Sequence, residues 1–225
     1  MQNVLDRFIN FMKWPVALFL FFSLPALVRS LDFFKFDSLK HVVLFGGFIC
    51  FFIARTFMDS SVRTSMEVLA HELTHALFAV LTLHKVSGIS INQDDSGGSM
   101  SFEGEGNWLI VIAPYFFPFF PLLAMISISI YTYFAEMNIL LHFVMGFVIG
   151  YHVDVVCSQI HEKQTDLPKV GYKFCALFLL PANFWMICSL LAFNSYGWKA
   201  VIKYQSLMMY LNGKTWNYVI NFLGF

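Results

Sequence analysis

The stretch MEVLAHELTHALFAVLTL, residues 66–83, decides how this chain is built. It is apolar enough to enter a lipid bilayer, yet its middle reads His71-Glu72-Leu73-Thr74-His75. Ionisable side chains are costly inside a membrane and persist there mainly where they bind or react. We therefore expect a membrane helix that carries a buried functional site.

The composition of the whole chain predicts an integral membrane protein. Of its 225 residues, 58% are hydrophobic and 12% are charged, whereas soluble domains carry about 25% charged residues. A formal net charge of zero gives no basic patch for nucleic acid, so the expected surroundings are the lipid bilayer and partners within it. A helix that crosses the bilayer needs about 20 mostly apolar residues, and by this measure the chain has six candidates. They fall at residues 14–29, 41–57, 65–84, 107–133, 138–158 and 172–193.

The predicted fold is an all-α polytopic membrane protein that forms a single membrane domain, residues 1–225. The fourth candidate span carries Pro114, Pro118 and Pro121, so we expect its helix to kink or break. After residue 195 the chain mixes Trp, Tyr and Lys with apolar residues, which predicts an interfacial C-terminal segment over 195–225.

A short non-helical segment follows the third candidate span. Its apolar residues alternate, with Ile89 and Ile91 before the sequence QDDSGGS and Met100 and Phe102 after it. This pattern predicts a two-stranded β-hairpin with a glycine turn, and the alternative is a plain exposed loop. A hairpin would present a strand edge to which an extended peptide can add.

The histidines at 71 and 75 predict a metal site. Residues i and i+4 project from the same face of a helix, so His71 and His75 can bind one ion while Glu72 stands beside it. This HExxH pattern suits Zn²⁺, which activates a water molecule whose proton Glu72 would accept. Glu67, one turn earlier, is interpreted as a helix-entrance charge, with orientation of His71 as the alternative role.

A catalytic zinc ion normally has three protein ligands, so one more must come from elsewhere in the chain. The favoured residue is His152, in the apolar part of the fifth candidate span. Asp166 is the second choice, with a helix N-cap as its alternative role, and Asp154 is the third. His41, His84 and His142 are assigned no role.

Three of these features together resemble the site-2 protease family of intramembrane zinc metalloproteases, in particular small members without a PDZ domain. They are HELTHALFAV in a membrane helix, the hairpin KVSGISINQDDSGGSMSFEGEG and the proline-rich IAPYFFPFFP. The resemblance implies a metalloprotease core over residues 60–170 that hydrolyses a peptide bond in or near the transmembrane segment of a membrane-anchored protein substrate. It further implies that His71 and His75 bind zinc, that Glu72 is the general base, and that the hairpin from Ile89 to Phe102 holds the substrate. The Leu-Asp-Gly segment that supplies the third ligand in much of the family does not occur in this sequence.

The expected location is a bacterial inner membrane. Two other readings compete with the protease. In the first, the metal braces a non-catalytic scaffold or pseudoprotease, and in the second, weaker one, the protein transports a metal ion.

Overall fold

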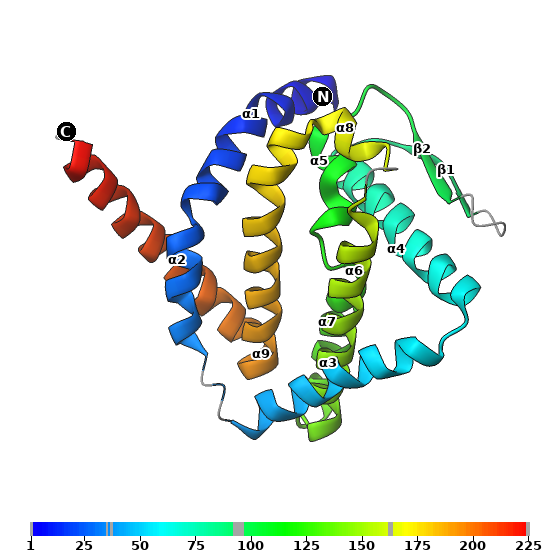
Figure 1. Cartoon of the computed structure of the whole chain (residues 1–225), viewed down its shortest axis with the longest axis vertical. Coiled ribbons are helices and arrows are strands. Elements are labelled where there is room, and N and C mark those ends of the chain that lie inside the picture. Colours follow the sequence, from blue (N-terminus) through cyan, green and yellow to red (C-terminus); the bar gives the residue numbers. More distant parts are fainter. Residues whose placement is uncertain (1, 35, 37, 92–96, 162–163, 224–225) are drawn as a thin grey trace.

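The computed structural model describes residues 2–34, 36, 38–91, 97–161 and 164–223, and most of them are helical (Figure 1). Helices and strands follow in the order α1 (Gln2–Phe22), α2 (Leu24–Arg29), η1 (Ser30–Phe33), α3 (Leu39–Phe57), α4 (Ser60–Leu81), β1 (Val86–Ile91), β2 (Gly98–Phe102), α5 (Trp108–Ile112), η2 (Ala113–Tyr115), α6 (Phe119–Phe134), α7 (Ile139–Gln159), α8 (Asp166–Val170) and α9 (Tyr172–Leu223).

The structure supports three to five membrane spans, and the predicted number of six is not confirmed. Among the described residues, three helices are long and apolar enough to cross a membrane, namely α3, α7 and α9. Two bent pairs pass the same test when each is taken together: α1 with α2 and η1, bent by 44°, and α5 and η2 with α6, bent by 77°. The chain is thus an integral membrane protein. Helix α4, predicted as a span over 65–84, is helical but is not among these candidates.

The helical spans are interrupted at Pro118 and at Gly197, and the first of these interruptions was predicted. Pro118 separates η2 from α6, since a proline ring leaves no backbone N–H for the helix ladder, and the predicted break of this span is confirmed. Helix α9 runs past the predicted end of its span at residue 193, but its backbone is non-helical at Tyr196 and Gly197. Gly197 has φ +63°, a left-handed conformation that favours glycine. This kink lies close to the start of the predicted C-terminal segment, 195–225, whose interfacial location stays a prediction.

Helix α1 begins much earlier than the predicted first span, which started at residue 14. Its first half carries Asp6, Asn10 and Lys13, which lower the hydropathy of this part of the sequence. All three have polar partners on other elements in the fold, so the helix can extend through them.

The β-hairpin is confirmed for the described residues. Strands β1 and β2 pair antiparallel, with Ile89 opposite Met100 and Ser90 opposite Ser99. Residues 93–96 of the predicted turn QDDSGGS lie outside the described part of the chain. The hairpin packs on α4, and in Figure 1 its strands lead to the end of the molecule where α1, α5 and α8 meet.

In the part of the chain that the structure describes, buried apolar side chains form two clusters. One joins α2, α3, α6, α7 and α9. The other joins α1, α4, α5, η2, α8 and the first half of α9. The second cluster surrounds the ends of the elements that carry the HExxH histidines and Asp166, and it thereby sets the position of the site.

Candidate metal centre

Helix α4 carries the two histidines of the HExxH sequence on one buried face. Asp59 caps its N-terminus by accepting a hydrogen bond from the backbone N–H of Ser61, at 2.8 Å. The exposed fractions of His71 and His75 are 8% and 9%. Their Nε2 atoms lie 3.0 Å apart, as expected from the i, i+4 spacing.

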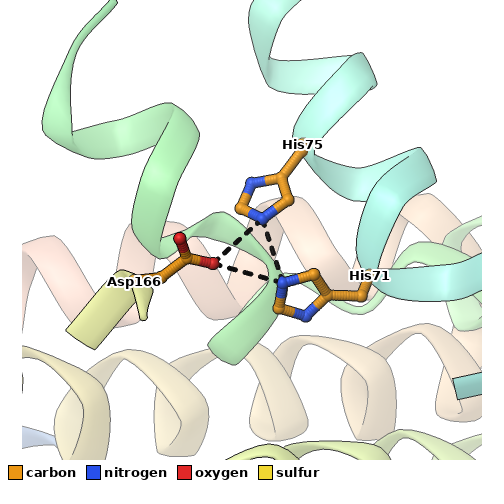
Figure 2. A group of neighbouring side chains, drawn as sticks. All are labelled: His71, His75 and Asp166. Atoms are coloured by element: carbon orange, nitrogen blue, oxygen red, sulfur yellow. Dashed lines mark hydrogen bonds and ion pairs between the residues drawn. The ribbon is translucent and has the colours of Figure 1, made fainter. Parts of the chain in front are cut away.

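Asp166 completes a group of three potential ligands (Figure 2). It is the first residue of the short helix α8, and its Oδ2 atom lies 3.3 Å from Nε2 of His71 and 3.2 Å from Nε2 of His75. Ligands held at about 2.0–2.2 Å from a tetrahedral zinc ion lie about 3.3–3.6 Å from one another. The observed spacings are therefore close to those that one ion would impose.

The outer nitrogens of both histidines are held by hydrogen-bond acceptors. Nδ1 of His71 donates to Oε1 of Gln159 at 2.8 Å, and Nδ1 of His75 donates to the carbonyl oxygen of Ile110 at 2.8 Å. The amide of Gln159 is fixed in this orientation, because its Nε2 donates to the carbonyl oxygen of Glu67 at 3.1 Å. With the proton on Nδ1, a neutral histidine has its lone pair on Nε2.

When both imidazoles are neutral, the two Nε2 lone pairs therefore face each other and a carboxylate oxygen of Asp166. Such a buried meeting of three acceptors is unfavourable unless a cation lies between them. Two imidazole nitrogens and one carboxylate oxygen are a ligand set that suits zinc, so these residues fit the metal that the sequence predicts.

The groups around Asp166 stabilise its negatively charged carboxylate form. Burial raises the pKa of its carboxyl group, but contacts with His71 and His75 and a hydrogen bond from Lys169 to Oδ1, at 2.9 Å, outweigh burial and hold the pKa well below its usual range. The hydroxyl group of Tyr115 also donates to Oδ2, at 3.4 Å. Asp166 is therefore a carboxylate at neutral pH. The N-cap position of α8 is Thr165, so the alternative role of Asp166 as an N-cap is not observed.

The favoured third ligand, His152, does not join this group. It lies on α7, is 4% exposed, and its Nε2 has no hydrogen-bond partner among the residues that the structure describes. Asp154, the third choice, forms an ion pair with Arg55 of α3. Helix α7 ends at Gln159, and the chain then turns so that Asp166 reaches the histidines. Spacing along the sequence could not reveal that turn.

Glu72 is buried beside the two histidines, with 6% of the residue exposed. It lines a cleft of about 760 Å³ that also contains His71, His75 and Asp166. Strand β2 borders the same cleft with Gly98, Ser99 and Met100. A Cβ atom on Gly98 would lie 2.8 Å from Cγ of Glu72, so glycine at this position lets the hairpin approach the carboxylate closely.

Sequence reasoning missed three groups that hold the centre. The Ile110 carbonyl oxygen gives no signal in a sequence, because every residue carries one. Gln159 could have been noticed as a polar residue at the end of an apolar helix, and it takes the role considered for Glu67. Tyr115 stands between prolines, where only the fold shows that its ring packs edge-on against His71, with 5.3 Å between centroids. The side chain of Glu67 instead accepts a hydrogen bond from Ser158.

Comparison with known proteins gives one family match. Residues 46–155 match the family model described as Peptidase M50B-like. No curated protein and no solved structure matches the chain. The matched segment contains His71, Glu72 and His75 and ends before Asp166.

Proposed function

Because the chain belongs to the site-2 protease family through residues 46–155, we propose that it is an intramembrane zinc metalloprotease. Its substrate would be a membrane-anchored protein, cut in or near the transmembrane segment. The expected location is a bacterial inner membrane.

One observation carries this proposal: the convergence of His71, His75 and Asp166 beside Glu72 in a cleft of an integral membrane protein. A site that only braced the bundle would use a fourth protein ligand, because structural zinc sites are closed. The group in this chain has three potential ligands among the described residues, and the cleft beside it has a volume of about 760 Å³.

We assign each residue a role in peptide hydrolysis. His71, His75 and Asp166 would hold Zn²⁺, which when bound makes water nucleophilic near neutral pH and polarises a carbonyl oxygen. Glu72 is the general base, because its carboxylate stands next to both histidines and is outside the ligand group. Gln159 and the Ile110 carbonyl oxygen keep both imidazoles in the tautomer that leaves Nε2 free to bind metal.

The hairpin is the proposed place for the substrate backbone. Strand β2 lines the cleft next to Glu72, and an extended peptide can pair with the edge of a strand. A transmembrane helix must unwind before its peptide bond can be attacked, and backbone hydrogen bonds to β2 would replace those lost from the helix.

The test replaces Glu72 with Gln in the full-length protein reconstituted in liposomes with a model single-span substrate. General-base removal should lower the cleavage rate by about 10²–10⁴-fold while zinc content stays at the wild-type level. Glu103→Gln is the matched control, because this carboxylate is exposed at the end of the hairpin and pairs only with Lys85 among the described residues. Unchanged cleavage by the Glu72 variant would refute the mechanism. Stoichiometric zinc with no cleavage by the wild-type protein would instead indicate a metal-braced scaffold.

A further inference from the structure

Helix α1 carries a stripe of polar residues toward the elements that form the metal centre. Gln2, Asp6, Asn10 and Lys13 are spaced by four, four and three residues, which places them on one face of the helix. Gln2 donates to the carbonyl oxygen of Glu103 at the end of the hairpin, Asn10 accepts from the backbone N–H of Trp108, and Lys13 donates to the carbonyl oxygen of Val170 at the end of α8. Polar groups in a membrane helix need such partners.

Asp6 is the most buried member of this stripe, with 5% exposed. Its Oδ1 accepts a hydrogen bond of 2.7 Å from Nδ2 of Asn107. Its Oδ2 lies 3.1 Å from Nε2 of His84, an ion-pair distance without hydrogen-bond geometry. One carboxylate therefore connects α1 to two segments that lead into the metal centre.

The first connection leads to His75 through helix α5. A carboxylate only accepts hydrogen bonds, so Asp6 obliges Asn107 to present its NH₂ group to α1 and its oxygen to α5. That oxygen caps α5 by accepting from the backbone N–H groups of Leu109 and Ile110, at 3.1 and 3.3 Å. The carbonyl oxygen of the same Ile110 then accepts the Nδ1 proton of His75.

The second connection leads to the end of α4, the helix that carries both histidines. The backbone N–H of His84 donates to the carbonyl oxygen of Ala79 at 2.8 Å, and its Nδ1 lies 3.0 Å from Oγ1 of Thr82. His84 follows Leu83, which has φ +66°, so the chain turns sharply between α4 and β1. Asp6 contacts the side chain that closes this turn.

We propose that Asp6 is a positioning residue for the metal centre, acting through Asn107 and Ile110 on the tautomer and orientation of His75. This inference rests on the proposed metal site. It gives α1 a part in metal binding. Asp6 lies about 70 residues before the HExxH histidines, outside both the motif and the segment that matches the family model.

The experiment titrates the metal-free, full-length protein in detergent micelles with Co²⁺ and follows the visible absorption of the bound ion. Asp6→Ala and Asn107→Ser should each weaken Co²⁺ binding by about 10–100-fold, the effect usual for residues that orient a ligand. Serine still caps a helix N-terminus but cannot donate as the Asn107 amide does. Asp6→Asn should recover most of the affinity, because its amide oxygen can still accept from Asn107. The control is Arg7→Ala, an exposed neighbour on α1, whose affinity should stay within about twofold of the wild type because distant surface changes act independently.

The double variant Asp6→Ala with Asn107→Ser separates a positioning role from general loosening. Two residues that act through one path give a combined loss no larger than the greater single loss, and additive losses would overturn the proposal. Co²⁺ affinity of Asn107→Ser equal to that of the wild type would also overturn it, even if Asp6→Ala did not fold. If the wild-type protein itself bound no Co²⁺, the metal site would fail and the proposed function with it. Tight Co²⁺ binding by the wild type and equally tight binding by all variants would instead refute only the role of Asp6 and leave the metal site in place.

Discussion

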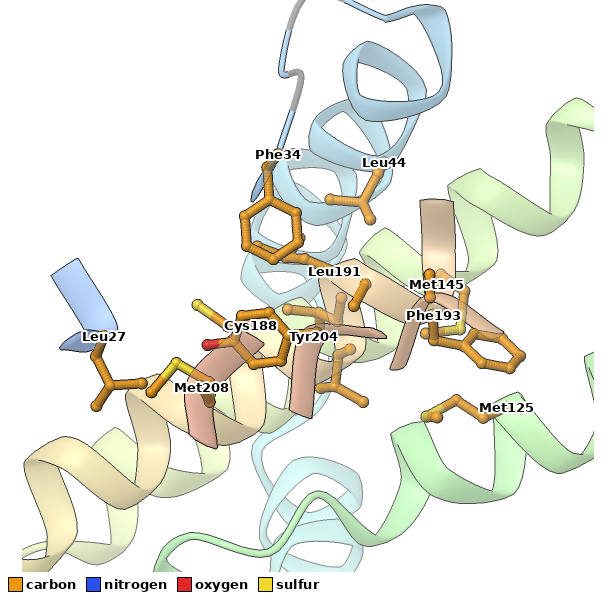
Figure 3. Packing of buried hydrophobic residues seen from close by; sticks show 14 of the residues in the cluster. Leu27, Phe34, Leu44, Met125, Met145, Cys188, Leu191, Phe193, Tyr204 and Met208 are labelled. Atoms are coloured by element: carbon orange, nitrogen blue, oxygen red, sulfur yellow. The ribbon is translucent and has the colours of Figure 1, made fainter. Parts of the chain in front are cut away.

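The metal centre and the contact between α3 and α7 are built in opposite ways. At the metal centre, three acceptor atoms of His71, His75 and Asp166 converge at 3.0–3.3 Å. Between α3 and α7 the two backbones approach closely instead, because Gly47 and Gly146 leave no side chain between them. Figure 3 shows part of the apolar cluster beside this contact, where Leu44 of α3 and Met145 of α7 lie among side chains of α9.

The two regions therefore contribute differently to the stability of the fold and to its function. Apolar packing stabilises the folded protein through every buried contact. Convergent acceptors without a cation cost free energy, and on the proposed function a bound ion would offset that cost. We therefore expect changes at the metal centre to alter metal binding and activity much more than the stability of the metal-free protein. Changes between α3 and α7 should do the reverse.

The largest expected effect comes from Asp166→Asn. A neutral amide is a poorer zinc ligand than a carboxylate. Loss of a residue that only orients a ligand typically lowers metal affinity by about 10–100-fold. Zinc affinity should fall by more than this in the Asp166 variant, and the cleavage rate should fall with it. Asparagine keeps the size of the side chain, so the unfolding temperature of the metal-free protein should change much less than its zinc affinity. Zinc content by mass spectrometry and thermal unfolding in detergent measure the two effects.

His152→Gln is the matched comparison, because it alters the buried histidine that sequence reasoning ranked first. Full zinc content is expected for this variant. Loss of zinc from the His152 variant together with its retention in the Asp166 variant would restore His152 as the third ligand.

Local patterns explain which features the sequence could predict. The facing of His71 and His75 follows from helix geometry, the break at Pro118 from the missing N–H, and the hairpin from alternation around a glycine turn. Each of these depends on neighbours within a few residues. The membrane character follows from composition.

The remaining features depend on contacts between distant parts of the chain. Asp166 reaches the histidines only through the turn that follows Gln159, whereas His152 was the favoured ligand because it lies in an apolar helix. Helix α1 extends through Asp6 because Asn107 and His84, about 80–100 residues later, provide its partners. The low hydropathy of the stretch around Asp6 argued against a membrane helix, so the predicted first span began too late in the sequence.

An intermediate effect is expected from Gln159→Leu. Leucine keeps the bulk of the side chain but removes the acceptor of the Nδ1 proton of His71, so the imidazole can rotate or change tautomer. Metal affinity should fall by about 10–100-fold, measured by Co²⁺ titration. Cys157→Ala, an exposed position on the same helix, is the control and should bind as the wild type does. Equal affinity of the Gln159→Leu variant and the wild type would show that Gln159 does not orient His71.

The smallest effect on metal binding, and the largest on stability, is expected between α3 and α7. A Cβ atom on Gly146 would lie 1.8 Å from the carbonyl oxygen of Leu44, so Gly146→Ala must push the two helices apart. Such overpacking typically costs about 1–3 kcal/mol. Gly46→Ala tests the same change on α3, where a Cβ atom would meet nothing within 4 Å, and alanine should there stabilise the helix by about 0.5–1 kcal/mol. The free energy of unfolding, measured in mixed micelles, should therefore fall for Gly146→Ala and rise for Gly46→Ala. The Co²⁺ affinity of the folded protein should stay unchanged in both variants. A loss of Co²⁺ affinity in folded Gly146→Ala would mean that the α3–α7 contact also positions the ligands, so that the two regions are not independent.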